Sequence, residues 1–139
     1  MIKYLETVDG LLADDLGAGY FERWPNPPDP GTHLQILHGS SQVVLAFDED
    51  SSKVVGFVTA ISDGVLCAYV PLLEVLPAYR HRGIGSELLR RMLERLSCYY
   101  MVDLVCDPHR QSFYERFNMT SGIAMIIRRV ERQHGSQGG

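Results

Sequence analysis

The chain has few cysteines, no long apolar run and no excess of positive charge, and each absence removes a class of protein. Its three cysteines, Cys67, Cys98 and Cys106, are odd in number and lack the spacing of metal ligands. We therefore expect buried thiols in a reducing compartment. No stretch approaches the ~18 apolar residues of a membrane span, and the charged N-terminus is unlike a signal peptide. The expected location is cytoplasmic, with no membrane partner.

Positive charge is scarce overall but concentrated locally. The 139 residues include 13 Lys and Arg against 17 Asp and Glu, for a net charge of −4. Nucleic acids and anionic membranes are bound through extended basic surfaces, so neither is an expected partner. Five arginines nevertheless lie between Arg80 and Arg95. This clustering suits one small anionic ligand.

Hydrophobic periodicity predicts one α/β (α+β) domain over residues 1–130 and a polar, flexible tail over residues 131–139. The expected strands are Ile2–Glu6, Gln42–Phe47, Lys53–Ile61, Val65–Leu76, Tyr100–Cys106 and Ile123–Val130. The expected helices are Leu11–Tyr20, Thr32–His38 with Thr32 as its cap, the segment after Gly85, and Phe113–Phe117. A helical crossover makes the fifth strand parallel to the fourth, whereas the earlier strands form an antiparallel meander. The prediction is a mixed, mostly antiparallel sheet flanked by helices in three layers.

The most informative stretch joins a strand to a helix. Pro77 ends the strand because proline cannot donate to a strand ladder, and apolar residues then recur at the three- and four-residue spacing of a buried helix face. Between them, Gly83 and Gly85 let the backbone approach a ligand, and the helix N-terminus presents unpaired N–H groups. The preceding cluster Arg80–Arg82 adds positive charge. We interpret this turn as a phosphate site.

Two motifs resemble those of a known family. The turn lacks the Gly-Lys-Ser/Thr of a P-loop and the third glycine of a dinucleotide fingerprint. It matches Arg/Gln-x-x-Gly-x-Gly/Ala at Arg80–Gly85, preceded by Val-x-Pro at Val75–Pro77. This pattern resembles the acetyl-CoA site of the GNAT N-acetyltransferases, and the order of predicted elements is similar to the GNAT fold. Phe113–Met119 resembles the family's second motif, with Asn118-Met119 in place of the usual Gly-Phe.

The resemblance implies an acetyl-CoA-dependent N-acetyltransferase. Such an enzyme moves an acetyl group to a primary amine, of a small molecule or an exposed protein amine, by direct attack on the thioester. In the family the turn holds the pyrophosphate, the strand before it pairs with the pantetheine arm, and a backbone N–H near Val75 would stabilise the thioester oxygen. Asp107 lies where many relatives have an Asn that contacts the cofactor. The expected cofactor-binding residues are Leu73, Val75, Arg80, His81, Arg82, Gly83, Ile84, Gly85, Ser86 and Asp107.

Two residues are candidates for catalysis. By its place in the second motif, Tyr114 would protonate the departing thiolate; the alternative is a tyrosine that packs its helix. Glu74 is a charged residue within an apolar strand and is the leading candidate for the base; the alternative is a strand residue that faces solvent. Tyr69 and Asp63 are weaker candidates for the base.

The remaining features of the sequence either allow two interpretations or indicate no site. The proline-rich segment Trp24–Gly31 either shapes the acceptor pocket or is a stiff surface loop. No metal site is expected, because the histidines are scattered and read as surface residues: His33, His38, His109 and His134. The rival functions are a non-catalytic coenzyme A-binding module, acting as a sensor or subunit, and a nucleotide binder. The acceptor amine is not specified, and a homodimer is left open.

Overall fold

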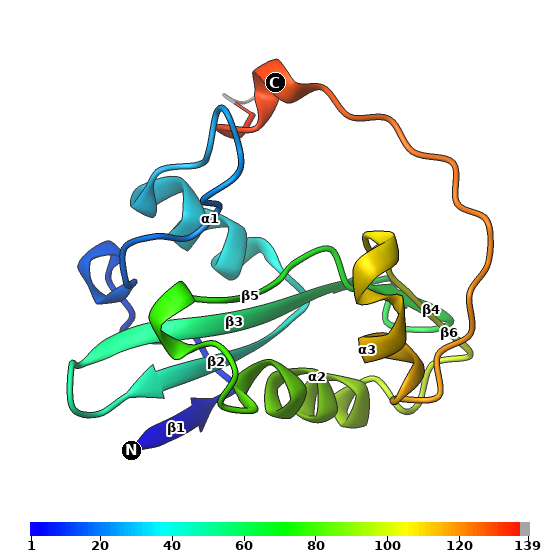
Figure 1. Cartoon of the computed structure of the whole chain (residues 1–139), viewed down its shortest axis with the longest axis horizontal. Helices are drawn as coiled ribbons and strands as arrows, with labels where there is room; N and C mark the ends of the chain where they lie inside the picture. The colour runs from blue at the N-terminus through cyan, green and yellow to red at the C-terminus, as the bar shows by residue number, and fades with distance from the viewer. Residues whose placement is uncertain (137–139) are drawn as a thin grey trace.

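The chain folds around a mixed six-stranded sheet with helices on both faces (Figure 1). The computed structural model describes residues 1–136. The strands are β1 (Ile2–Leu5), β2 (Gln42–Asp48), β3 (Lys53–Ser62), β4 (Cys67–Tyr69), β5 (Leu73–Val75) and β6 (Met101–Asp103). The helices are α1 (Pro30–Gly39), α2 (Ile84–Arg95) and α3 (Gln111–Glu115), with 3-10 turns η1 (Ala13–Asp15), η2 (Pro77–Tyr79), η3 (Pro108–Arg110) and η4 (Val130–Arg132).

The strand order is β1-β2-β3-β4-β6, and β5 also pairs with β3. Every pairing is antiparallel except that between β4 and β6, which is parallel. The helix between β4 and β6 is α2, so the crossover has the predicted form. The predicted mixed, mostly antiparallel sheet in a three-layer domain is confirmed, with α1 and α2 on opposite faces (Figure 1).

The prediction of one long strand over Val65–Leu76 is wrong. Val70-Pro71-Leu72 separates β4 from β5, and Pro71 has no N–H to continue the ladder. The Val70 N–H instead donates to the Asp103 carbonyl at 2.9 Å, and the Leu72 carbonyl accepts from the Thr59 N–H at 3.0 Å. The chain is therefore hydrogen-bonded to β6 at Val70 and to β3 at Leu72.

The predicted helix over Leu11–Tyr20 is also wrong, because only η1 forms there. Gly17 packs so closely that a Cβ would lie 2.4 Å from Leu76 Cδ1, and Gly19 has a positive φ of 112°. The chain is extended at Leu16, which bridges Val54. Tertiary packing against β3 overrides the weak helical pattern.

The second predicted helix is present but starts earlier. α1 begins at Pro30, whose fixed φ suits the first helical position. Its cap is Asp29, whose Oδ1 accepts the Thr32 N–H at 2.8 Å, so the prediction of Thr32 as the cap is wrong. The predicted Tyr100–Cys106 strand is shortened to β6, and the predicted Phe113–Phe117 helix is α3, two residues earlier.

The predicted strand Ile123–Val130 is absent, because the segment is extended without a ladder partner among the described residues. Beyond it, η4 is followed by a contact with the segment before α1: Asn26 donates its backbone N–H to Gln133 Oε1 at 3.1 Å. The flexible tail predicted for residues 131–139 stays a prediction, and its part over 137–139 lies outside the described residues. Within residues 1–136, no helix is both long and apolar enough to cross a membrane.

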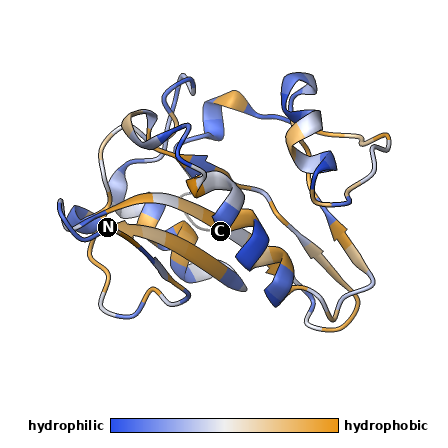
Figure 2. Cartoon of the chain, turned by 60° about the horizontal axis from the view of Figure 1, so that its bottom comes forward, coloured by the Kyte–Doolittle hydropathy of each residue, from blue (hydrophilic) through white to orange (hydrophobic). Residues whose placement is uncertain are grey.

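Two apolar clusters hold the three layers together. Leu88 and Met92 of α2 pack on one face of the sheet against Val44 and Val58, and all four side chains are fully buried. Phe57, Leu37 and Leu45 lie in the cluster on the α1 face. Figure 2 shows the strands as mostly hydrophobic and the helices as mixed, as burial of one helix face requires. The cysteines do not belong to this core: Cys98 is exposed, and Cys67 and Cys106 are half-buried, so the prediction of buried thiols is wrong.

His33 is buried on the α1 face, so the prediction of a surface histidine is wrong for this residue. Its side chain is only 2% exposed and lies against the rings of Tyr20, Phe21 and Phe57, with centroids 4.5–5.1 Å away. Its Nε2 has no hydrogen-bond partner in the described part of the chain. Burial lowers the pKa of His33 to about 4, because the aromatic surroundings disfavour the imidazolium.

This burial makes stability depend on pH. The unfolded chain takes up a proton at His33 near pH 6.5, whereas the folded chain does so only near pH 4, so the free energy of unfolding should fall as pH drops through this window. The loss should reach roughly 3 kcal/mol. Urea denaturation at neutral and acidic pH measures it. In His33→Phe this component should vanish, and in the control His38→Phe, on the exposed side of α1, it should remain. An unchanged pH dependence in His33→Phe would contradict the assignment.

Candidate functional site

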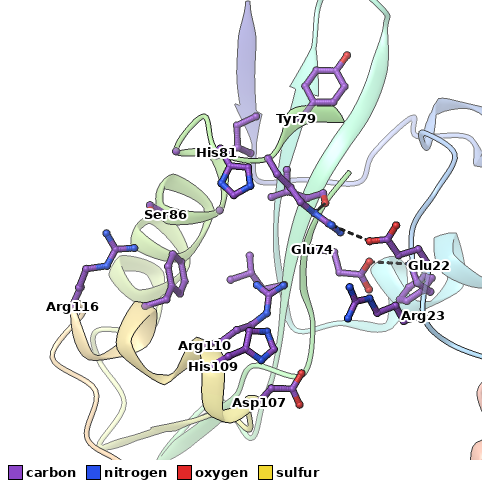
Figure 3. Close-up of a pocket in the computed structure, with 18 of the residues that line it drawn as sticks. Glu22, Arg23, Glu74, Tyr79, His81, Ser86, Asp107, His109, Arg110 and Arg116 are labelled. Atoms are coloured by element: carbon purple, nitrogen blue, oxygen red, sulfur yellow. Dashed lines mark hydrogen bonds and ion pairs between the residues drawn. The ribbon is translucent and has the colours of Figure 1, made fainter. Parts of the chain in front are cut away.

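A cleft of about 600 Å³ opens where β5 and the chain after β6 separate (Figure 3). β4 and β6 pair over only three residues each, from Cys67↔Met101 to Tyr69↔Asp103. β5 then continues along β3, while the segment after β6 turns away through η3 into α3. The cleft therefore has β5 and the start of α2 on one side and Asp107–Phe113 on the other.

On the cleft side, most backbone groups of β5 have no ladder partner among residues 1–136. Leu72 and Leu76 use their carbonyl and N–H, respectively, to pair with β3. Because ladder bonds alternate along an antiparallel strand, Glu74 also pairs with β3, opposite Phe57, while Leu73 and Val75 turn their backbone groups the other way. One of these groups has a side-chain partner: the Val75 carbonyl accepts from Arg80 Nε at 3.1 Å. The remaining groups of Leu73 and Val75 form an open edge that an extended ligand could pair with.

The N-terminus of α2 lies beside this edge because β3 has a glycine, Gly56, where the helix packs on the sheet. Gly56 of β3 has no side chain, and a Cβ there would come within 3.1 Å of Leu88, 3.2 Å of the Glu74 carbonyl and 3.4 Å of Ile84. The missing side chain lets Ile84 and the first turn of α2 rest directly on β3. The preceding turn is also fixed at η2, where the Tyr79 hydroxyl donates to Asp48.

The turn before α2 has the backbone of an anion site. His81 and Gly83 have positive φ values of 64° and 81°, and Gly83 is the N-cap. No side chain caps the helix, so the N–H groups of residues 84–86 have no capping partner among the described residues. A Cβ at Gly83 would meet nothing within 4 Å, so the space beside this residue at the start of the helix is open. A phosphate is suited to this position by both the free donors and the helix dipole.

Both arginines of the Arg80–Gly85 motif already make contacts within the protein. Arg80 lines the cleft but pairs with Glu22 at 2.9 Å across it, besides its bond to Val75. Arg82 lies 5.0 Å over the ring of Tyr79 and does not line the cleft. The other predicted cofactor-binding residues all line the cleft: Leu73, Val75, His81, Gly83, Ile84, Gly85, Ser86 and Asp107.

All three residues of β5 line the cleft, but Leu73 and Val75 pack against the cluster on the α2 face, whereas the Glu74 side chain contacts Phe21 on the α1 face. Its Oε1 accepts the N–H of Phe21 at 2.9 Å, and Phe21 holds a strained positive φ of 60°. Burial raises the pKa of the Glu74 carboxyl, although the Phe21 N–H and the Arg80 charge act against the rise. In Figure 3, Glu74 points into the cleft toward Arg23.

Tyr114 does not line the cleft, whereas its neighbour Phe113 does. The two rings touch edge to face at 5.0 Å. Burial raises the pKa of the Tyr114 phenol, and the nearby Arg110 charge opposes this only in part. The phenol therefore stays protonated and can donate a hydrogen bond.

The weaker base candidates do not line the cleft. Asp63 caps the turn before β4: one oxygen accepts N–H groups from Val65, Leu66 and Cys67, and these bonds lower its pKa to about 2. A carboxylate held so acidic is a poor base. Tyr69 is 38% exposed on β4.

Of the proline-rich segment Trp24–Gly31, which was expected either to shape the acceptor pocket or to form a stiff surface loop, Trp24 lines the cleft and packs on Phe21 at 4.8 Å. The cleft also contains residues that the sequence analysis did not place there. The further lining residues with charge or proton affinity are Glu22, Arg23, His109, Arg110 and Arg116. No sequence pattern marks them, because they come from two irregular segments on either side of the cleft. Among the described residues, no group of three or more His, Cys, Asp and Glu is placed to hold a metal ion.

Comparison with known proteins agrees with this geometry. The family model described as "Acetyltransferase (GNAT) family" matches residues 11–119. A crystal structure of a candidate acetyltransferase from Deinococcus radiodurans R1 is 46% identical, with a TM-score of 0.93 over 99% of this chain and 94% of its own. A GNAT-family acetyltransferase from Streptococcus pneumoniae TIGR4 is 27% identical, with a TM-score of 0.70 over 93% of this chain and 100% of its own.

A more distant structure shares the fold alone. It is the glucosamine-6-phosphate N-acetyltransferase of Arabidopsis thaliana, 12% identical, with a TM-score of 0.64 over 93% of this chain and 98% of its own. No curated protein sequence matches. The family match and the Deinococcus relative each cover most of the chain, and the Arg80–Gly85 turn lies within both. This protein therefore belongs to the GNAT family of acetyltransferases.

Proposed function

We propose that the chain transfers an acetyl group from acetyl-CoA to a primary amine, of a small molecule or an exposed protein amine. The observation that supports this most is the pairing of an open β5 edge with an uncapped helix N-terminus in one cleft. An extended amide-containing arm that ends in a pyrophosphate needs both features, one after the other. A nucleotide would use the helix N-terminus but leave the strand edge unused.

The binding roles follow from the free backbone groups. N–H groups at residues 84–86 would receive the pyrophosphate, and the free backbone groups of Leu73 would pair with a pantetheine amide. The Val75 N–H would donate to the thioester oxygen as it gains negative charge. Arg80 acts mainly by holding the Val75 carbonyl and Glu22, and so keeps the turn beside β5. Asp107, opposite the turn, would contact the cofactor from the far side.

The chemistry needs two proton movements. The amine nitrogen forms a bond to the acetyl carbon, the carbon–sulfur bond breaks, and the sulfur takes the electron pair. Glu74, directly or through water, accepts the proton that the ammonium loses. Tyr114 donates a hydrogen bond or its proton to the departing sulfur, and its raised pKa favours the hydrogen bond.

The direct test is thiol release from acetyl-CoA with a panel of amines, beside calorimetric binding of coenzyme A, ATP and NAD. Amine-dependent release with product acetylation supports the proposal. Tight coenzyme A binding without turnover on any amine would favour the non-catalytic module, which the occupied Arg80 and the recessed Tyr114 leave as the second candidate. Tighter binding of ATP or NAD would identify a nucleotide binder.

Gly83→Ala should weaken coenzyme A binding. The new methyl group would lie in open space beside the start of α2, next to the free N–H groups. We expect it to disturb at least one charge-assisted hydrogen bond to the pyrophosphate, worth about 1.5–3 kcal/mol or roughly ten- to a hundredfold in affinity. Gly64→Ala is the matched control, because Gly64 has φ 78° against 81° and equally open surroundings, but lies outside the cleft. Both variants should lose similar thermal stability. Equal coenzyme A affinity in the two would contradict the assigned site.

Tyr114→Phe should lower kcat on the best amine by about a hundredfold, because the variant keeps the ring and loses only the donor to the sulfur. Coenzyme A affinity and folding should persist. Tyr100→Phe, at an 84% exposed position, is the control. Near-normal kcat, measured in single turnovers that isolate the chemical step, would return Tyr114 to a packing role.

Glu74→Gln should lower kcat near neutral pH, with partial recovery as the amine loses its proton unaided at higher pH. The amide oxygen can still accept the Phe21 N–H, so the fold should be preserved. In the parent protein, activity should fall as acid protonates Glu74, and its raised pKa places this loss above the usual carboxyl range. The pH–rate profiles of both proteins measure the effect. Identical profiles would remove Glu74 as the base.

A further inference from the structure

The charged side chains that line the cleft are not balanced by one another. The pair between Arg80 and Glu22, at 2.9 Å, removes one charge of each sign. Among residues 1–136, the other charged side chains of the lining belong to no ion pair: Arg23, Glu74, Asp107, Arg110 and Arg116. Arginines outnumber carboxylates in this set, so the cleft keeps an excess of positive charge after its internal pairing.

These unpaired arginines lie at two ends of the cleft. Figure 3 shows Arg116 on the side of the first turn of α2, where the phosphates of the cofactor are proposed to bind. Arg23 follows closely after Phe21, whose N–H bonds Glu74, so Arg23 is on the side of the proposed base. Arg110 ends η3 on the opposite wall. Arg23 and Arg110 therefore face the place that the acceptor amine must occupy.

Arg110 is also close to both groups that are proposed to move protons. Burial raises the pKa of the Glu74 carboxyl and of the Tyr114 phenol, and the Arg110 charge opposes the rise in each. Because the effect of a charge falls off with distance, its guanidinium lies near both groups. In Figure 3 this guanidinium points into the cleft, whereas the Asp107 carboxylate points away from it. A positive charge without an acidic partner among residues 1–136 therefore stands at the reacting end of the cleft.

We propose that the acceptor is a small amine that also carries an anionic group, a carboxylate or a phosphate, and that Arg23 and Arg110 bind this group while the amine faces Glu74. The inference rests on the acetyl transfer proposed above. A guanidinium binds either anion through two parallel hydrogen bonds. A simple alkylamine or a lysine side chain would instead bring a further positive charge between two arginines, without an anion to offset it.

The rest of the cleft is suited to a small molecule of this kind. Its volume of about 600 Å³ has to hold the acyl end of the cofactor as well as the acceptor. Trp24, half-buried and packed on Phe21 at 4.8 Å, offers an apolar surface next to Arg23 for the remainder of the acceptor. In the transfer the amine nitrogen bonds to the acetyl carbon, sulfur leaves with the electron pair of the broken carbon–sulfur bond, and Glu74 takes the ammonium proton. The acid group is unchanged.

Thiol release from acetyl-CoA with paired amines tests the proposal. The pairs are glycine with glycinamide, phenylalanine with phenylalaninamide, and O-phosphoethanolamine with ethanolamine. The first two pairs report on a carboxylate and the third reports on a phosphate. In at least one kind of pair, the acidic member should have a kcat/KM at least about tenfold higher, as one charge-assisted hydrogen bond provides. A preference for the neutral member of every pair, or for a lysine-containing peptide over all of them, would overturn the proposal.

Two variants connect the preference to the named arginines. Arg23→Gln and Arg110→Gln should each lower the ratio of kcat/KM between the acidic and the neutral amine by about ten- to a hundredfold, mainly through the KM of the acidic one. The ratio cancels any effect on Glu74 or Tyr114, since both amines of a pair use the same groups. Arg129→Gln is the control, because Arg129 is exposed, lies outside the cleft and belongs to no ion pair among residues 1–136. An unchanged ratio in both cleft variants would contradict the assignment.

Calorimetry separates this inference from the proposed reaction. N-acetylphenylalanine, its amide and N-acetyl-O-phosphoethanolamine are titrated into the chain in the presence of coenzyme A. At least one of the two acidic ligands should bind more tightly than the amide, and this difference should shrink about tenfold or more in Arg110→Gln. Failure of every amine to release thiol would contradict the acetyl transfer, and the binding preference would still support the anion site. Equal affinity for the acidic and the neutral ligands would overturn that site, whether or not acetyl transfer occurs.

Discussion

The site depends on the separation of β5 from β6 in the sheet. Pro71 cannot donate to a ladder, and around it the chain leaves β4 and joins β3 as β5. β6 stays with β4, so the sheet forks, and the fork creates both the cleft and the free backbone edge of Leu73 and Val75. Gly56 then admits α2 close to β5, which adds the helix N-terminus to the same opening. A backbone site of this kind needs few conserved side chains, because its donors are main-chain atoms.

Ion pairs, rather than the number of charged residues, determine which charges are available in the cleft. The chain as a whole is acidic, and two prominent arginines are neutralised by their own helix: Arg90 and Arg91 both bind Glu87. Arg80 is held by Glu22 in a half-exposed pair that contributes little to stability but fixes the turn. Arg23, Arg110 and Arg116 line the cleft and take part in no ion pair among residues 1–136. They bring positive charge to the cleft in addition to Arg80.

Apolar burial is uneven along the chain. The strands β2 and β3 and the inner face of α2 are almost wholly buried, so the hydrophobic effect is concentrated in the two clusters on either face of the sheet. Residues 120–130 also include large apolar side chains, such as Ile123 and Met125, but every residue of this segment is exposed.

The sequence by itself determined the features that depend on neighbouring residues. Pro77, Gly83, Gly85 and the apolar spacing of α2 act within about a dozen residues, so they predicted the strand–turn–helix unit and the family, which are confirmed. The phosphate site at the same turn stays a prediction. Only the tertiary structure decided what depends on distant contacts. Close packing of Leu16 and Gly17 against Val54 and Leu76 replaced the predicted helix. The Phe21 N–H bonded Glu74, and His33 was enclosed by three aromatic rings. Ile123–Val130 has every local property of a strand, but a strand forms only where another chain segment offers its edge.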